Sequence, residues 1–264
     1  MLEMFSYTFM VRALIAGVLV AITVPVLGSF LVTRRYALIT DSLAHVSLAG
    51  IGAGLLLGFA PITLAIPVTI TGALVLEWLR SNHKISGEIS LAILMSSGLA
   101  IAVVLANLAH GANTDFTAYL FGSIATTTLA DIIALTAVAT VTLSIIGLKY
   151  RTLLHIAYDE DSARIAGYRV TALNYLMTAL TAVVVVLSLR IVGGLLISAL
   201  LVMPVITASR FARSFAGTVL LAVIAALIAI IIGLTIAFYA GIAAGGAIVL
   251  TALVLLLLAL IWRR

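Results

Sequence analysis

The chain has 264 residues, of which 64% are apolar and only 9% are charged. A soluble protein carries about 25% charged residues, and a water-soluble fold of this size cannot bury so much apolar surface, so the composition excludes a disordered chain, a nucleic-acid-binding protein and an ordinary cytosolic enzyme. The 14 basic residues outnumber the 9 acidic ones, and in so apolar a chain we interpret this excess as a signal of membrane topology.

The apolar residues fall into stretches long enough to cross a bilayer as helices. About 20 apolar residues cover about 30 Å of hydrocarbon. Dividing the chain at its charges and at its Pro and Gly residues gives candidate spans at 11–33, 37–59, 61–79, 87–109, 129–148, 171–189, 191–209, 217–238 and 243–262. We therefore predict an all-α, polytopic membrane protein with about nine transmembrane helices, or eight as the alternative count, in a single domain over residues 1–264.

Basic residues also indicate how these spans are oriented. Twelve of the fourteen fall on one side of the predicted membrane, and only Arg12 and Arg190 fall on the other. Since cytoplasmic loops carry the excess of Lys and Arg, we expect the C-terminus in the cytosol and the N-terminus outside. The first apolar stretch lacks a small-residue cleavage pattern, so we expect a retained span and not a signal peptide.

Two polar segments interrupt the spans. Segment 110–124 is expected on the outer side, where its aromatic residues are typical of a short interfacial helix; its His110 and Asp115 are either contacts for a substrate or partner or simply solvated. Segment 150–170 is expected in the cytosol. It contains three consecutive acids that suit the N-terminus of a short helix, and the residues alone leave open whether that helix is a plain connector or a docking element.

Asp41 and His45 are the polar residues inside a span that most need an explanation. They are four residues apart and so share one helix face, roughly 6–14 Å into the membrane, where an unpaired ionisable group is costly. One interpretation is a packing pair in which the imidazole hydrogen-bonds its own acid. The other is a cation site, because imidazole and carboxylate together suit borderline ions such as Zn(II) or Mn(II); two copies of the chain would supply four ligands.

The same helix carries Gly50, Gly54 and Gly58 at every fourth position. Small residues at this spacing let helices approach closely. We therefore expect this span to be packed against other helices on most sides.

Other polar residues in the spans have structural explanations. Glu88 and Asp131 lie at helix starts, where an acid complements the helix dipole. Glu77 is expected to form a surface pair with Arg80, and Asn107 could hydrogen-bond a neighbouring helix.

Several catalytic patterns are absent from the sequence. There is no cysteine, so a metal must be held by His, carboxylate or backbone oxygen. The phosphate-binding pattern G-x-x-x-x-G-K-[ST] and the zinc-protease pattern H-E-x-x-H are also missing. We therefore do not expect an enzyme.

Four segments resemble the permease subunits of bacterial metal-ion ABC importers, the zinc-uptake branch most closely. The signature "RRM…GDxLAHxSLxG" resembles RRYA (34–37) followed by DSLAHVSLAG (41–50). In the same order, "DLMAYLFGD" resembles DFTAYLFGS (115–123), "VGALLISALLIIP" resembles VGGLLISALLVMP (192–204), and "ARRFAR" resembles ASRFAR (208–213). Departures at Thr40 and Ser123, and the lack of Asp-x-Pro near 239–245, leave manganese or iron as alternatives to zinc.

The resemblance implies an assembly and a pathway. It implies a permease homodimer in the bacterial inner membrane, two copies of a cytosolic ATPase subunit that hydrolyses ATP, and an extracytoplasmic metal-binding protein. Asp41 and His45 would lie on the path of the transported metal, and no permanently bound cofactor is expected. A coupling helix would dock on the ATPase; the matching positions are Asp159, Glu160, Asp161, Ala163 and Gly167. The rival hypotheses are a secondary transporter or channel driven by an ion gradient, and more distantly a structural membrane protein.

Overall fold

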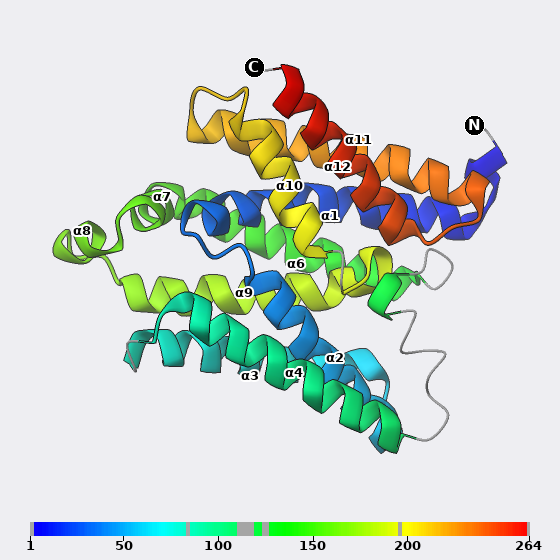
Figure 1. Ribbon diagram of the computed structural model, residues 1–264, viewed down its shortest axis with the longest axis horizontal. Helices are drawn as coiled ribbons and strands as arrows, with labels where there is room; N and C mark the ends of the chain where they lie inside the picture. Colours follow the sequence, from blue (N-terminus) through cyan, green and yellow to red (C-terminus); the bar gives the residue numbers. More distant parts are fainter. Residues whose placement is uncertain (1–2, 83–84, 110–118, 123–126, 195–196, 263–264) are drawn as a thin grey trace.

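The computed structural model describes residues 3–82, 85–109, 119–122, 127–194 and 197–262, and these parts are helical without any strand (Figure 1). The elements are η1 (Glu3–Ser6), α1 (Thr8–Thr33), α2 (Ile39–Leu57), α3 (Pro61–Asn82), α4 (Gly87–Leu108), α6 (Leu129–Leu148), α7 (Tyr150–Tyr158), α8 (Glu160–Ile165), α9 (Val170–Val192), α10 (Ile197–Ser209), α11 (Phe215–Ala240) and α12 (Ala244–Trp262). The predicted all-α fold is confirmed.

Eight of the described helices are long and apolar enough to cross a membrane, so the alternative count is the one observed. The predicted span 191–209 is shorter than expected, because α9 continues to Val192 and α10 has only 13 residues. Gly193 follows α9 with φ 88, a conformation that side-chain-bearing residues rarely adopt. At 1.5 Å per residue, α10 is about 20 Å long, which is less than the hydrocarbon thickness.

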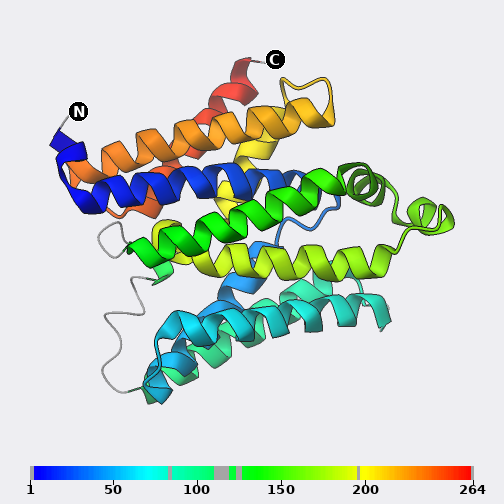
Figure 2. The same ribbon diagram turned by 180° about the vertical axis from the view of Figure 1, so that it is seen from behind.

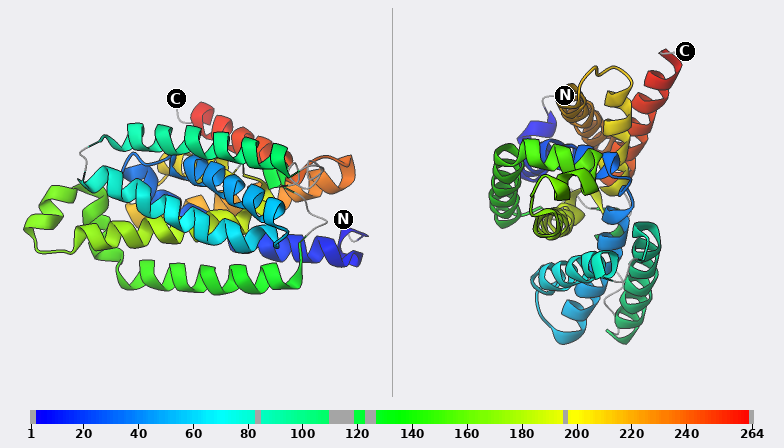
Figure 3. Two further views of the ribbon diagram at one scale, coloured as in Figure 1. Left: turned by 90° about the horizontal axis from the view of Figure 1, so that it is seen from below. Right: turned by 90° about the vertical axis from the view of Figure 1, so that its left-hand side faces the viewer.

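The helices form two groups joined by α2 (Figure 3). Helices α3 and α4 pack on either side of α2, whereas α1, α6, α9, α10, α11 and α12 make up the larger group. Helices α7 and α8 project beyond one end of the bundle, opposite the end that holds the N-terminus (Figure 2). Contacts of α3 with α9, and of α2 with α9 and α10, hold the two groups together.

Glycines let α2 approach its neighbours at the level of the backbone. A Cβ atom at Gly50 would lie 2.6 Å from the Cα of Ala65 on α3, and one at Gly54 would lie 2.8 Å from the Cα of Pro61. The packing expected at these two positions is therefore present. Gly58 differs from the expectation: it has φ 71 and no neighbour within 4 Å, and it ends α2 as a left-handed cap instead of packing.

The expected helix-end roles of the acids are seen, whereas the role of Asn107 is not. Asp131 completes a capping box with Thr128, and Glu88 lies in the first turn of α4, whose cap is Ser86. Among the described residues, Asn107 makes no hydrogen bond to a neighbouring helix. Its side-chain amide donates to the carbonyl of Val103, one turn earlier in α4 (3.0 Å).

We predict that Gly50→Ala lowers the midpoint of thermal unfolding of the purified protein in detergent. The added methyl group meets the backbone of α3, which has no flexible side chain to move away, and overpacking of this kind costs about 1–3 kcal/mol. Gly147→Ala is the matched control, since a Cβ at this position in α6 meets nothing within 4 Å. An equal or higher midpoint for Gly50→Ala would contradict close packing of α2 on α3.

Candidate functional site

Asp41 and His45 lie on the one uncovered stripe of the N-terminal half of α2. Between Ile39 and Gly52 every residue is buried except these two, which are half-buried. The flanking faces are fixed to neighbours: Ser42 Oγ donates to the carbonyl of Leu91 on α4 at 2.9 Å. Along this stretch of the helix, only these two residues are partly accessible.

The His45 ring retains an unused nitrogen. Its Nδ1 atom is buried and has no hydrogen-bond partner, and among the described residues no hydrogen bond joins the ring to the Asp41 carboxylate. A buried polar atom without a hydrogen-bond partner lowers the stability of the fold, because its desolvation is not compensated. The packing-pair interpretation predicts that hydrogen bond, so the arrangement favours a group held ready for a ligand.

A single copy of the chain supplies a partial ligand set at this point. Within the described ranges, no group of three or more His, Asp or Glu side chains is placed to hold a metal ion. One imidazole and one carboxylate make half of a four-coordinate shell. A four-coordinate metal ion at this point would need two further ligands beside this pair.

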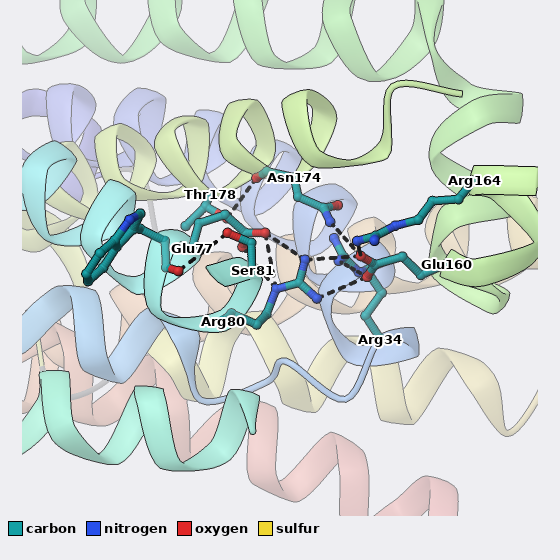
Figure 4. A network of polar contacts seen from close by, with 9 residues as sticks. Arg34, Glu77, Arg80, Ser81, Glu160, Arg164, Asn174 and Thr178 are labelled. Atoms are coloured by element: carbon teal, nitrogen blue, oxygen red, sulfur yellow. Dashed lines mark hydrogen bonds and ion pairs between the residues drawn. The ribbon is translucent and has the colours of Figure 1, made fainter. Parts of the chain in front are cut away.

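A second polar cluster lies at the end of the bundle that carries α7 and α8 (Figure 4). The carboxylate of Glu160, in the first turn of α8, accepts hydrogen bonds from Arg34 (3.2 Å), Arg80 (3.0 Å), Arg164 (3.0 Å) and Asn174 (3.2 Å). These donors come from the end of α1, from the end of α3, from α8 itself and from α9. We call this set the Glu160 cluster.

Glu77 extends the Glu160 cluster into the protein. Its carboxylate accepts from Arg80 Nη2 at 2.6 Å and from Nε at 3.1 Å, a two-point contact. The pairing of Glu77 with Arg80 was expected, but its location at the surface is wrong, because Glu77 is only 1% exposed. Helix α9 packs on α3 and makes this last turn an interior position.

The charges of the Glu160 cluster keep its carboxylate ionised. Burial by itself would raise the pKa of Glu160, but hydrogen bonds and charge from Arg80, together with the charge of Arg34, outweigh it and hold the pKa below its ordinary value. Glu160 is therefore negative at neutral pH. Its protonation would require acid well below that range.

The segment between α1 and α2, residues 34–38, is a compact turn that we call the elbow. The Tyr36 amide donates to the carbonyl of Leu31 at 2.8 Å, and the Ile39 amide donates to that of Tyr36 at 3.2 Å. Burial, and next the nearby negative charge of Glu77, raises the pKa of the Tyr36 phenol to about 12. The Tyr36 ring lies against Gly87, where a Cβ would be 2.6 Å away, so the elbow is held on the start of α4.

The predicted coupling residues divide between the two faces of α8. Asp159 caps the helix by accepting from the Ser162 amide (3.0 Å), and Ala163 is fully buried. Glu160 points into the Glu160 cluster, whereas Asp161 is exposed. Gly167 is also exposed and adopts φ 83 just after the helix.

Sequence reasoning did not bring the Glu160 cluster together. Arg34 and Arg80 lie 126 and 80 residues from Glu160 in sequence, and Asn174 lies 14 residues from it on another helix. The one usable signal in the sequence was an acid, Glu77, three residues before Arg80 at the end of a predicted span. His110 and Asp115 lie outside the described residues.

The family model described as "ABC 3 transport family" matches residues 6–263 of the chain. The chain is 30% identical to the "High-affinity zinc uptake system membrane protein ZnuB" of Haemophilus influenzae, over 96% of this chain and 97% of that protein. It is 31% identical to the "Manganese import system permease protein ScaB" of Streptococcus parasanguinis, over 96% and 90% respectively.

The fold is also similar to a solved structure. A chain of "PsaBC from Streptococcus pneumoniae in complex with Fab" superposes with a TM-score of 0.86 and 29% identity, covering 97% of this chain and 94% of that one. The similarity thus extends over nearly the whole length of both chains.

We predict that Arg80→Met destabilises the protein strongly, by about 3–5 kcal/mol, because it leaves the buried Glu77 carboxylate without its ion-pair partner. Arg164→Met is the matched control. This side chain is 53% exposed, and an exposed ion pair contributes about 1 kcal/mol or less. Unfolding in detergent, followed by circular dichroism, measures both; equal effects of the two substitutions would show that Glu77 is not an interior charge.

Proposed function

The chain belongs to the ABC 3 transport family, and from this premise we propose that it is the membrane permease subunit of an ATP-driven importer that moves Zn(II) into the cytoplasm. One observation carries the choice of site. Asp41 and His45 are the only residues not buried between Ile39 and Gly52, and one His45 nitrogen has no partner. A metal ion on its way through the protein would meet a carboxylate and an imidazole here.

The choice of Zn(II) rests on the chemistry of this pair and on one relative. Imidazole nitrogen together with carboxylate oxygen suits both ions, but such a nitrogen-containing ligand set binds Zn(II) more tightly than Mn(II). ZnuB of Haemophilus influenzae is named for zinc uptake, and ScaB of Streptococcus parasanguinis is named for manganese import. Mn(II) is therefore the second candidate, with Fe(II) chemically between them.

Two copies of the permease would complete the metal site. Each copy contributes Asp41 and His45, so a homodimer with its two-fold axis beside this face of α2 has four ligands. An extracytoplasmic metal-binding protein would deliver the ion at the end that holds the N-terminus. The end that carries α7 and α8 is rich in Arg and Lys, which supports a cytosolic location for that end.

The ATPase partner would dock on the outer face of α8. Asp161 and Ile165 are exposed on α8, Ile165 to 89%. The buried Ala163 anchors the opposite face of the same helix. An exposed apolar side chain beside a charged one on a capped helix suits a protein contact. Hydrolysis of ATP would then take place in the partner, and this chain would carry the conformational change.

The rival function is transport driven by an ion gradient, which needs no ATPase. Co-purification from the native membrane separates the two: the importer hypothesis expects a P-loop ATPase to be retained, and ATP to be required for metal uptake into vesicles. Uptake that follows an ion gradient in vesicles without ATP would overturn the proposed function.

We predict that Asp41→Asn and His45→Gln each abolish metal uptake while the complex still assembles. Both substitutions roughly keep side-chain size and replace the carboxylate or imidazole ligand by a neutral amide, which binds Zn(II) much more weakly. Uptake of radioactive zinc by reconstituted vesicles is the measurement, with gel filtration as the assay for assembly. Asp131→Asn is the control, since Asp131 is also an acid in the first turn of a long helix but serves a capping box. Normal uptake by both Asp41 and His45 variants would refute this site.

We predict that the vesicles accumulate Zn(II) faster than Mn(II) at equal free concentration. The expectation follows from the imidazole at His45 and from the higher affinity of nitrogen-containing sites for Zn(II) than for Mn(II). Parallel uptake of the two radioactive ions decides it. Faster uptake of manganese would assign the importer to that metal and leave the role of Asp41 and His45 intact.

A further inference from the structure

The inner face of α8 carries the charged carboxylate of Glu160, which points away from the surface on which a partner would dock. Glu160 follows the cap residue Asp159, but its carboxylate turns away from the exposed side of the helix and toward the bundle (Figure 4). Its side chain is 23% exposed, against 53% for Arg164 on the same helix. A docking residue would be expected to remain available at the surface.

We propose that Glu160 is a positioning residue that ties α8 to α2, so that displacement of α8 moves the face that holds Asp41 and His45. The inference rests on the proposed function and deepens it. It assigns the transmission of movement to one carboxylate and two arginines, Arg34 and Arg80.

The first connection runs through the elbow. Arg34 Nη2 donates to Glu160 Oε2 at 3.2 Å, and Arg34 directly follows α1. From there the compact elbow leads to α2, whose first turn contains Asp41. A displacement of Arg34 is therefore transmitted to Asp41 through the few hydrogen-bonded residues of the elbow.

The second connection runs through α3. Arg80 donates to both oxygens of Glu160, at 3.0 and 3.3 Å, and is itself fixed by Glu77. Helix α3 in turn lies against α2 at Gly50 and Gly54, where the backbones nearly touch. Since α3 and α2 cannot slide apart without opening this contact, Arg80 moves α2 as part of a packed pair.

Both connections meet at the Glu160 carboxylate, which binds Arg34 and Arg80 at the same time. A carboxylate has about four acceptor sites, and Glu160 fills them from Arg34, Arg80, Arg164 and Asn174. Charge-assisted hydrogen bonds of this kind are short and directional. Glutamine at this position would keep the size of the side chain and one acceptor oxygen, but would lose the charge that holds the two arginines.

The test is Glu160→Gln in the complete importer, with its ATPase partner and binding protein, reconstituted in lipid vesicles. ATP hydrolysis and uptake of radioactive zinc are measured on the same preparation. We expect hydrolysis to stay near the unsubstituted level while uptake falls on the order of tenfold, in the range of typical coupling between distant sites. The number of ATP molecules used per zinc ion should rise by the same factor.

Glu88→Gln is the matched control. Glu88 lies at the same end of the molecule and lines the same polar pocket of about 330 Å³ as Glu160, but makes no ion pair among those found in the described residues. It should leave the ATP-to-zinc ratio unchanged. Arg34→Met is the second variant: it removes only the elbow end of the connection, and should raise the ratio in the same direction even if Glu160→Gln reduces assembly.

Three outcomes would overturn the inference. Uptake and hydrolysis that fall in proportion would mean that Glu160 serves docking or folding. Normal uptake in both the Glu160 and the Arg34 variants would mean that the connection is not needed. An increase in both hydrolysis and uptake would mean that the Glu160 cluster stabilises one conformation and slows the transport cycle. The proposed function fails separately, if the unsubstituted importer takes up no metal with ATP.

Discussion

The arrangement of this end of the molecule depends on one shared carboxylate. Charges near the hydrocarbon are tolerated only in pairs, and Glu160 provides the negative charge for arginines from the elbow, from α3 and from α8. It makes the only ion pair of Arg34 among the described residues. Because a guanidinium keeps its charge under all ordinary conditions, these arginine charges stay paired only while this carboxylate is ionised and in place.

The second constraint is the close approach of α2 to α3 and α4 at a few glycines. Contacts of backbone on backbone at Gly50 and Gly54 leave no soft layer that could absorb a displacement. Gly98 adds the same kind of contact on the α4 side, where a Cβ would lie 2.9 Å from the Val46 amide nitrogen. Helices α2, α3 and α4 therefore respond as one body. Charge anchors this body at its end, and close packing keeps the polar face of α2 fixed within it.

Hydropathy was sufficient to predict the long helices, because each must satisfy its own backbone in lipid. Hydropathy overestimated the length of the helix at 191–209, because it does not show that the chain turns at Gly193. The role of Gly58 was missed because cap and packing glycines look alike in sequence. The position of Glu77, and the convergence on Glu160, depend on which helices become neighbours, and charge spacing along one helix does not contain that information.

The incompleteness of the Asp41 and His45 pair is consistent with transport as opposed to storage. A full tetrahedral shell within one chain would bind a metal ion strongly and release it slowly. In the proposed homodimer, two ligands per copy would bind a metal ion weakly alone and strongly only while the two copies are aligned, so a small relative movement of the two α2 helices would change the affinity greatly. A helix in this role has to be rigid, open along one narrow stripe, and connected to the element that moves it. Close packing on α3 and α4 supplies the first property, the two half-buried residues would supply the second, and on our proposal the Glu160 cluster would supply the third.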